Sequence, residues 1–407
     1  MEKYFQKEFE SFISQDYKFA ISEIAMIAEL SGIKIYLIGG IVRDLILKTP
    51  VKDVDITVEG NAIEFCKNLE QKTDCKIIAV QENLRTAKVE FKSGVVIDFA
   101  STREEFYPEQ GVLPVAKNFG CKLINDVKRR DFTINTLALE LTGNEKFKLV
   151  DYFDGYSDIQ NKKIKILHDK SFEDDASRIV RAIKFQMRLG FDIDEKTEKL
   201  MQNYLKNVNK TMPLERIKNE LRQYFCISAD NLYQNLTEKN VYKLISDNPI
   251  KNIDLSALEK IKQYFDFSNL WFIYIALMIV NSDFENPRLN LTANEKKILR
   301  EVKELQALYP LKDENFEIYS ALIEKTELSP VIYYVITRDN AVLKFYSALK
   351  QIKVLITGKD LIDLGFIPSP YFTKLFETVL KEKLSGNLQT KREELEFVKK
   401  FLDGCKN

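Results

Sequence analysis

Hydrophobic residues recur along the chain at two different spacings. In residues 1 to about 32 they recur every three or four positions, which predicts helices. From residue 33 to about 100, short apolar or alternating runs predict strands, with one helix expected for AIEFCKNLEQK. The expected strands are KIYLIGG, DVDITV, CKIIAV, TAKVEF and VVIDFAS. One crossing through a helix combined with hairpins predicts a small mixed sheet.

The pattern changes after this region. Residues 103–128 contain Pro108, Gly111, Pro114 and Gly120, and they are expected to form a long linker of the kind that is usually functional or mobile. Helical spacing dominates from about residue 129, interrupted by strand-like segments between 149 and 169. The sequence therefore predicts an α+β fold class, with a mixed-sheet front and an all-helical rear.

Composition narrows the class of protein. The 407 residues are 30% charged and 45% hydrophobic, which is ordinary for a globular protein, and the length allows two to four compact units. The net charge is zero, which still allows a local basic face. The single histidine, His168, and five cysteines without CxxC spacing argue against zinc and disulfides. The longest apolar run, Leu270 to Val280, is shorter than the about 20 residues that span a membrane. A cytoplasmic protein with no membrane contact is expected.

A phosphate-binding turn is predicted where GGIVRD follows the first strand. Gly39 and Gly40 let backbone amides approach an anion closely, because no Cβ intervenes. Arg43 adds a planar cation for phosphate oxygens. A plain turn into a helix is the alternative.

Three aspartates in predicted strands are candidate catalytic groups. Asp53 and Asp55 lie two apart in DVDITV and should share one face of the strand, where two carboxylates can hold Mg²⁺ against a triphosphate. Asp98, in VVIDFAS, is a candidate third carboxylate for metal-assisted phosphoryl transfer. The alternative is that these side chains are merely solvated.

The segment RRDFTIN combines Arg129, Arg130 and Asn135 around Asp131. Adjacent arginines have little use in packing, so at least one of them is expected to contact phosphate or nucleic acid. Asp131 is expected to cap a helix that starts here and to share a face with Asn135.

A continuous helix is predicted for FEDDASRIVRAIKF, with Asp175, Arg178 and Arg181 on one polar stripe. An exposed, salt-bridged helix face is one interpretation. In the other, a carboxylate acceptor beside a guanidinium donor reads the edge of a base. Arg216 and Glu220 in the next expected helix are interpreted as an intrahelical pair, with a possible bracing role between helices.

In their order, these motifs resemble the class II tRNA nucleotidyltransferases, a family of CCA-adding, CC-adding and A-adding enzymes and bacterial poly(A) polymerases. The resemblance covers residues 35–375 and departs from the usual EDxxR motif in having Asp174 for glutamate and Ala176 where proline is common. The matching segments are GGIVRD with DVD, RRDFTIN, DYFDG, DDASR, ERIKNE and ITGKDLIDLGFIPSP.

The resemblance implies a polymerase-beta-type nucleotidyltransferase head followed by an all-helical neck, body and tail. The expected bounds are 1–147 for the head, 148–225 for the neck, 226–310 for the body and 311–407 for the tail. It implies that Asp53 and Asp55 bind Mg²⁺, and that Gly39, Gly40 and Arg43 bind the triphosphate. It also implies that Asp175 and Arg178 pair with the incoming base beside Asn135 and Arg181.

The implied partners are CTP, ATP and the 3′ end and acceptor stem of tRNA. Addition of CCA is the expected activity, because residues 103–128 look like the complete loop that CC-adding members are understood to lack. Addition of A alone, addition of CC alone and poly(A) synthesis are alternatives within the family. A catalytically silent RNA-binding protein is the alternative outside it.

Overall fold

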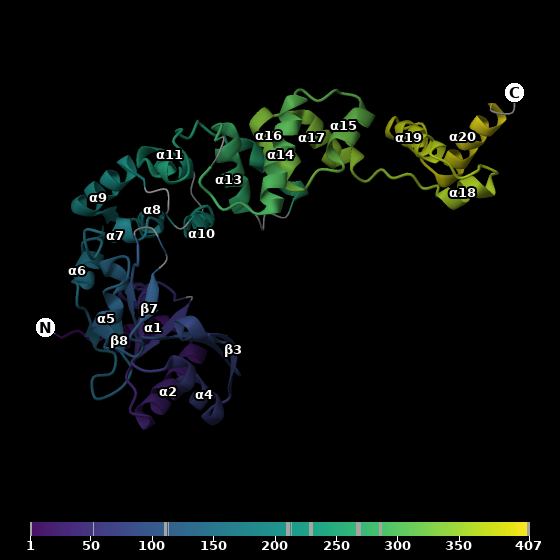
Figure 1. Ribbon diagram of the computed structural model, residues 1–407. Coiled ribbons are helices and arrows are strands. Elements are labelled where there is room, and N and C mark those ends of the chain that lie inside the picture. Colours follow the sequence, from purple (N-terminus) through teal and green to yellow (C-terminus); the bar gives the residue numbers. More distant parts are fainter. Residues whose placement is uncertain are drawn as a thin grey trace. The chain divides into compact units, whose positions relative to one another are not determined.

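The computed structural model divides into two compact units, Met1–Ile245 and Ser246–Asn407 (Figure 1). The structure describes residues 2–51, 53–109, 112, 114–208, 212, 214–227, 231–265, 270–284 and 287–404. The expected division into four parts remains a prediction.

A mixed sheet forms the centre of the first unit. Among the described residues it has seven strands in the order β3-β4-β5-β2-β1-β8-β9. β2 and β5 run parallel, whereas the other neighbours run antiparallel. The strands are β1 (Ile35–Ile38), β2 (Val54–Val58), β3 (Cys75–Gln81), β4 (Thr86–Phe91), β5 (Val96–Ser101), β8 (Ala138–Glu140) and β9 (Leu149–Val150). The predicted mixed sheet is confirmed.

Helices flank this sheet. α2 and α4 pack beside each other, and α4 packs against β3, β4 and β5 (Figure 1). The helices of this unit are α1 (Gln6–Phe12), α2 (Gln15–Leu30), α3 (Gly40–Ile46), α4 (Ala62–Lys72), α5 (Leu123–Val127), α6 (Gly155–Gln160), α7 (Ser171–Asp174), α8 (Ser177–Leu189), α9 (Glu195–Lys206), α10 (Leu214–Tyr224) and α11 (Leu232–Glu238). Short 3-10 turns are η1 (Glu82–Leu84), η2 (Thr133–Asn135) and η3 (Val241–Leu244).

Alternation along β5 separates the core from the candidate site. Phe99 is buried, and its ring centroid lies 6.0 Å from that of Phe65 in α4. Because successive side chains of a strand point to opposite faces, Asp98 lies on the face away from α4. Asp55 is the register partner of Asp98 and lies on that same open face.

The prediction of a long linker for residues 103–128 is wrong. β6 (Glu104–Phe106) and β7 (Val115–Lys117) form an antiparallel pair, and α5 follows them. Contacts between the two strands stabilise the pair, including the Lys117 ammonium 5.1 Å from the centroid of the Phe106 ring. Pro and Gly in this segment predict a loop, but such pairing depends on contacts that local composition does not show.

The helix expected to start at Asp131 is also absent from this described region. The chain instead forms η2 and then β8, which pairs with β1. Asp131 accepts a hydrogen bond from the Phe132 amide at 2.8 Å and caps no helix. Pairing with β1 buries Leu137, Ala138 and Leu139, so tertiary burial outweighs the local helical pattern.

Two short strands, β10 (Lys163–Ile164) before α8 and β11 (Asp192–Ile193) after it, form a parallel pair. β11 lies in the region expected to be helical only, so that expectation is wrong at this point. Its two residues are too few to give a periodic signal.

The second unit is helical. Its helices are α12 (Ser256–Ile261), α13 (Leu270–Asn281), α14 (Ala293–Ala307), α15 (Asn315–Leu322), α16 (Leu328–Thr337), α17 (Asn340–Lys344), α18 (Gly358–Asp363), α19 (Tyr371–Leu384) and α20 (Lys391–Gly404). A short 3-10 turn, η4 (Lys262–Tyr264), and a short π-helix, η6 (Phe345–Leu349), accompany them. The apolar run from 270 to 280 is a buried helix, as predicted. Among the described helices, none has the length and apolar character needed to cross a membrane.

Candidate functional site

A cavity of about 1550 Å³ opens in the first unit, beside the face of the sheet that carries Asp55 and Asp98. Its lining comes from β2, β4, β5, α3, the η2 segment, α8 and α10. The predicted site residues that line it are Gly39, Gly40, Arg43, Asp55, Asp98, Arg129, Arg130, Asn135, Asp175, Arg178 and Arg181. Asp53 precedes β2, is exposed and is not among the lining residues.

The strand carboxylates converge at one end of the cavity. Asp55 and Asp98 are direct partners in the parallel register, and Asp98 Oδ2 lies 3.0 Å from Lys88 Nζ. Burial raises the pKa of Asp55, and the negative charges of Asp98 and Asp53 raise it further, whereas Arg130 opposes the shift. The carboxylates therefore repel one another, and a bound cation would relieve this repulsion.

This donor set fits a divalent metal shared with a substrate. Among the described residues, no group of three His, Cys, Asp or Glu side chains is placed to hold a metal by itself. Mg²⁺ is typically held by one or two carboxylates together with substrate phosphates and water. The carboxylates of Asp55 and Asp98, which both line the cavity, have the chemistry of such a shared site, whereas Asp53 lies outside the lining.

The turn between β1 and α3 is shaped for close approach. Gly39 has φ +76°, a left-handed backbone conformation that favours glycine. A Cβ at this position would lie 2.9 Å from Nη1 of Arg130, so a side chain would collide with the guanidinium. The Gly39 amide donates to the Leu137 carbonyl at 2.9 Å, which ties the turn to β8.

Arg43, on α3, is buried and held in one orientation. Its Nη1 donates to Asn135 Oδ1 at 2.7 Å, and its Nε donates to Asp44 Oδ1 at 2.9 Å. Burial lowers the pKa of Arg43, and Asp44 opposes this effect. Arg43 and Asn135, two site residues predicted separately from the sequence, are therefore in direct contact beside the glycine turn.

Asp131 links this group to α8. Its Oδ1 accepts from Asn135 Nδ2 at 3.0 Å, and its Oδ2 accepts from Arg181 Nε at 2.7 Å. Burial would raise the pKa of Asp131, but Arg181 and Asn135 outweigh it and lower the pKa to about 2. Arg181 also donates to Glu220 Oε1 of α10 at 2.9 Å.

Asp175 and Arg178 do not belong to one continuous helix. α7 ends at Asp174 and α8 begins at Ser177, and Asp175 between them has an extended backbone. Asp175 and Arg178 are 0% and 4% exposed, so the alternative of a solvated, salt-bridged helix face is wrong. At the break, the amide and the hydroxyl of Ser177 both donate to Asp175 Oδ1. The i, i+3 spacing of Asp175 and Arg178 in the sequence does not reveal this break.

The orientation of these two side chains depends on other elements. Asp175 Oδ2 pairs with Arg216 Nη2 of α10 at 2.7 Å. Arg178 Nη1 donates to Ser171 Oγ at 2.7 Å, and its Nη2 donates to the Arg129 carbonyl at 2.9 Å. Arg216 thus pairs with Asp175, and Glu220 pairs with Arg181 of α8, so both residues connect α10 to its neighbours. This confirms the bracing role, and these contacts replace the expected pair within the helix.

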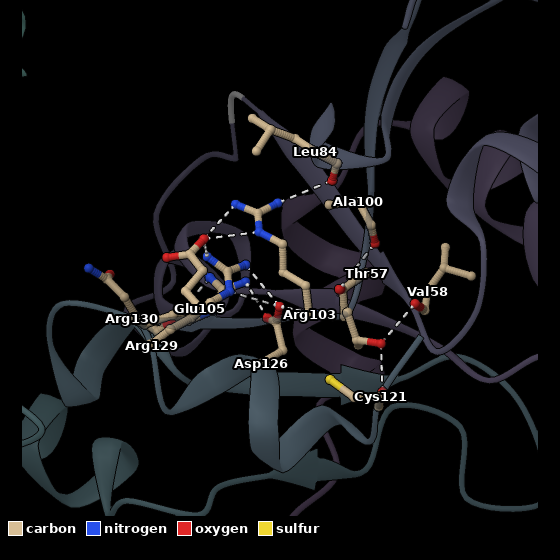
Figure 2. A network of polar contacts seen from close by, with 12 residues as sticks. Thr57, Val58, Leu84, Ala100, Arg103, Glu105, Cys121, Asp126, Arg129 and Arg130 are labelled. Atoms are coloured by element: carbon tan, nitrogen blue, oxygen red, sulfur yellow. Dashed lines mark hydrogen bonds and ion pairs between the residues drawn. The ribbon is translucent and has the colours of Figure 1, made fainter. Parts of the chain in front are cut away.

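The adjacent arginines have different surroundings (Figure 2). Arg129 Nη1 donates to Glu105 Oε1 at 3.1 Å and Nη2 to Asp126 Oδ1 at 2.8 Å. Arg130 lies beside Gly39 and donates to the Asn135 carbonyl at 3.3 Å, and its Nη2 also donates to Asp126 Oδ2 at 3.4 Å. Glu105 and Asp126 were not predicted as site residues, because they lie in the segment expected to be a linker.

Known proteins are similar in sequence to this chain over most of its length. Residues 35–165 match the family described as the poly A polymerase head domain. The chain is 28% identical to the A-adding tRNA nucleotidyltransferase of Geobacter sulfurreducens, and the alignment covers 95% of this chain and 47% of that protein. It is 27% identical to the protein of that name from Halalkalibacterium halodurans, with 96% of this chain and 94% of that one covered. The chain thus spans about half the length of the first relative and nearly all of the second.

Solved structures share its fold. The structure titled CCA-adding enzyme apo form II has a TM-score of 0.78 and 24% identity, and the match covers 98% of this chain and 99% of that one. The Thermotoga maritima CCA-adding enzyme complexed with tRNA has a TM-score of 0.70 and 23% identity, with 99% of both chains covered. The predicted fold class is therefore confirmed, and the sequence matches confirm the predicted resemblance to this group of proteins.

Proposed function

We propose that this member of the family of tRNA nucleotidyltransferases and bacterial poly(A) polymerases adds nucleotides to the 3′ ends of tRNA without a nucleic-acid template. The observation that supports this proposal most strongly is the shared cavity, because it collects residues from motifs far apart in the sequence. Paired carboxylates, a glycine turn and buried arginines are the groups that nucleotidyl transfer requires.

In the proposed reaction, the 3′-hydroxyl of the tRNA attacks the α-phosphorus of a nucleoside triphosphate, and pyrophosphate leaves. Asp53 and Asp55 would hold Mg²⁺, which when bound lowers the pKa of the hydroxyl and stabilises charge on the phosphoryl oxygens. The Gly39 turn and Arg43 bind the triphosphate, since Asn135 and Asp44 already hold the guanidinium in place. Such fixed orientation avoids reorganisation when the phosphate arrives.

The choice of base is assigned to Asp175 and Arg178. A carboxylate can accept from an exocyclic amine, and a guanidinium can donate to a ring nitrogen or carbonyl. Cytosine and adenine both present an amine beside a ring acceptor, whereas uracil and guanine do not present the same edge. This arrangement supports use of CTP and ATP, as two solved relatives of this fold are titled as complexes with ATP and with CTP.

We propose addition of the full CCA sequence, because the β6–β7 hairpin and α5 occupy the segment whose absence would indicate CC addition. Addition of A alone is the second candidate, since the Geobacter and Halalkalibacterium relatives are both named as A-adding. The partners in either case are tRNA, CTP or ATP, and the proposed location is the cytoplasm.

Two tRNA substrates distinguish the candidates. A CCA-adding enzyme extends a tRNA that ends before CCA with CTP and then ATP, and it also adds A to a tRNA ending in CC. An A-adding enzyme extends only the second substrate. If labelled ATP and CTP are incorporated into neither tRNA, the proposed transfer activity is wrong and the alternative of a silent RNA-binding protein is supported.

A further inference from the structure

Arg129 borders the cavity, but carboxylates occupy all of its guanidinium nitrogens (Figure 2). Nε and Nη2 donate to Asp126 Oδ1 at 3.1 and 2.8 Å, and Nη1 donates to Glu105 Oε1 at 3.1 Å. The Arg129 side chain is 18% exposed, whereas that of Asp126 is 0% exposed. These bonds use three of the five N–H donors of the guanidinium and fix its orientation.

The two carboxylates come from separate elements. Glu105 lies on β6 of the hairpin, and Asp126 lies in α5. Asp126 also accepts from the Arg103 amide at 3.1 Å, so the start of the hairpin is fixed to the same group. Burial raises the pKa of Asp126, but Arg129 and Arg130 outweigh it and keep the pKa below its ordinary value. Arg129 therefore joins the hairpin to α5 through a charged, buried contact.

Arg178 depends on this joined structure. Its Nη2 donates to the Arg129 carbonyl at 2.9 Å and to the Tyr107 hydroxyl at 3.4 Å. Tyr107 is the first residue after β6, the strand that carries Glu105. Both acceptors are therefore placed by the residues that Arg129 holds together.

We infer that Arg129 is a positioning residue for nucleotide choice: its side chain clamps Glu105 and Asp126 so that its own carbonyl and the Tyr107 hydroxyl orient Arg178. The inference rests on the proposed function, in which Arg178 reads the base. It separates the two neighbouring arginines by their other contacts. Both pair with Asp126, Arg130 through Nη2 to Oδ2 at 3.4 Å, but only Arg129 reaches Glu105, whereas Nη1 of Arg130 lies beside the glycine turn proposed to bind the triphosphate.

The test compares Arg129→Lys with Arg130→Lys in the full chain. Lysine keeps the charge, but one ammonium does not reproduce the fork that binds Glu105 and Asp126. Equilibrium binding of labelled ATP, CTP, GTP and UTP without tRNA gives the selectivity, and kcat and KM for incorporation give the catalytic effect. Arg129→Lys should reduce the preference for ATP over GTP and for CTP over UTP by about tenfold, whereas Arg130→Lys should weaken all four nucleotides about equally.

Glu105→Gln provides a milder second variant that leaves Arg129 unchanged. It should reduce the same preferences, and it also weakens the pair of Glu105 with Arg103. The double variant Glu105→Gln/Arg129→Lys should lose little more than either single variant, because both disrupt the contact between Glu105 and Arg129. Thermal melting checks folding, and if Arg129→Lys does not fold, the selectivity of Glu105→Gln decides the test.

Unchanged selectivity in the folded variants overturns the inference, as does an equal loss of affinity for all four nucleotides in Arg129→Lys. These outcomes leave the proposed function standing if the wild-type protein extends tRNA. Conversely, a wild-type protein that selects ATP and CTP in binding but extends no tRNA contradicts the proposed function. The altered binding selectivity of Arg129→Lys would still support the positioning role in that case.

Discussion

Charged side chains in the cavity are oriented by one another rather than left free for a ligand. Asp131 holds both Asn135 and Arg181, and Asn135 in turn holds Arg43. Fixed dipoles and charges of this kind act on a substrate without the cost of reordering them. The same contacts make the stability of the first unit depend on the ionisation of buried groups.

Asp131→Asn should reveal this dependence through pH. Contacts in the folded state lower the pKa of Asp131 from 3.8 to about 2, so its stabilising effect is complete above about pH 4 and is lost as pH falls toward 2. The variant should unfold about 2 kcal/mol more easily than wild type at pH 6. Urea unfolding should show this difference shrinking by about 1 kcal/mol at pH 3. A difference in stability that does not change with pH would show that these contacts do not lower the pKa of Asp131.

Two cysteines should react at different rates. Cys226 is exposed and lines the cavity, whereas Cys66 is buried, and burial raises the pKa of the Cys66 thiol. Iodoacetamide should therefore modify Cys226 first, because the thiolate is the reactive form. Mass spectrometry of the peptides measures both rates, and added ATP or CTP should slow only the reaction of Cys226. Equal rates would contradict the burial of Cys66, whereas a Cys226 rate that does not change with nucleotide would contradict the assignment of this cavity to nucleotides.

The sequence predicted most polar groups of the cavity but not the pairs that they form. Arg43, Asn135 and Arg178 stand in short motifs with recognisable chemistry. Their partners across the fold do not, since Glu105 and Asp126 reach Arg129 only after the hairpin has formed. Arg216 was identified, but its contact with Asp175 depends on how α10 packs on α8, which spacing within one helix does not show.

At the scale of elements, strongly periodic segments were predicted correctly. The alternation of β5 and the apolar stripe of α4 are local patterns, and both elements lie where expected. β8 and the β6–β7 hairpin were missed because each strand has only three residues and is stabilised by its neighbour. Short strands carry too little periodic signal to be distinguished from helix or loop.

The packing of α6 on η2 gives a prediction at this scale. A Cβ on Gly155, the first residue of α6, would lie 2.3 Å from the Thr133 carbonyl oxygen. Gly155→Ala must therefore displace backbone and should destabilise the first unit by about 1–3 kcal/mol. Chemical denaturation measures the loss, which should be accompanied by weaker nucleotide binding, because η2 carries Asn135.

Gly60→Ala serves as the control for this change. A Cβ on Gly60 would meet only ordinary contacts, at 3.7 Å from Val58 and 3.8 Å from Ile33. This variant should stay close to wild type in stability. Similar losses in Gly60→Ala and Gly155→Ala would mean that the close approach of α6 to η2 is not the cause.

At the scale of the whole molecule, the candidate site lies entirely within the first unit, and the helical second unit is left for other contacts. The proposed substrate is tRNA, and its phosphates need positive charge on the protein. Because the net charge of the chain is zero, this positive charge must be concentrated locally. Lysines of the second unit, such as Lys353, Lys359 and Lys381, are candidate contacts.

Affinity for tRNA should therefore depend steeply on salt. Filter binding at 50 and 200 mM salt should show a loss of about tenfold or more for tRNA. Replacing Lys353 and Lys359 by alanine should weaken tRNA binding and flatten this dependence, and it should leave ATP binding unchanged. Salt-independent binding would argue against phosphate contacts as the basis of tRNA recognition.

The central claim is that carboxylates at the start of β2 support nucleotidyl transfer to tRNA. Its most direct test is incorporation of labelled ATP into a tRNA ending in CC, with wild type, Asp53→Asn and Asp55→Asn in Mg²⁺ and after chelation. The account predicts incorporation by wild type in Mg²⁺ only, and none by either variant although both still fold and bind tRNA. Incorporation by Asp55→Asn at the wild-type rate would contradict it.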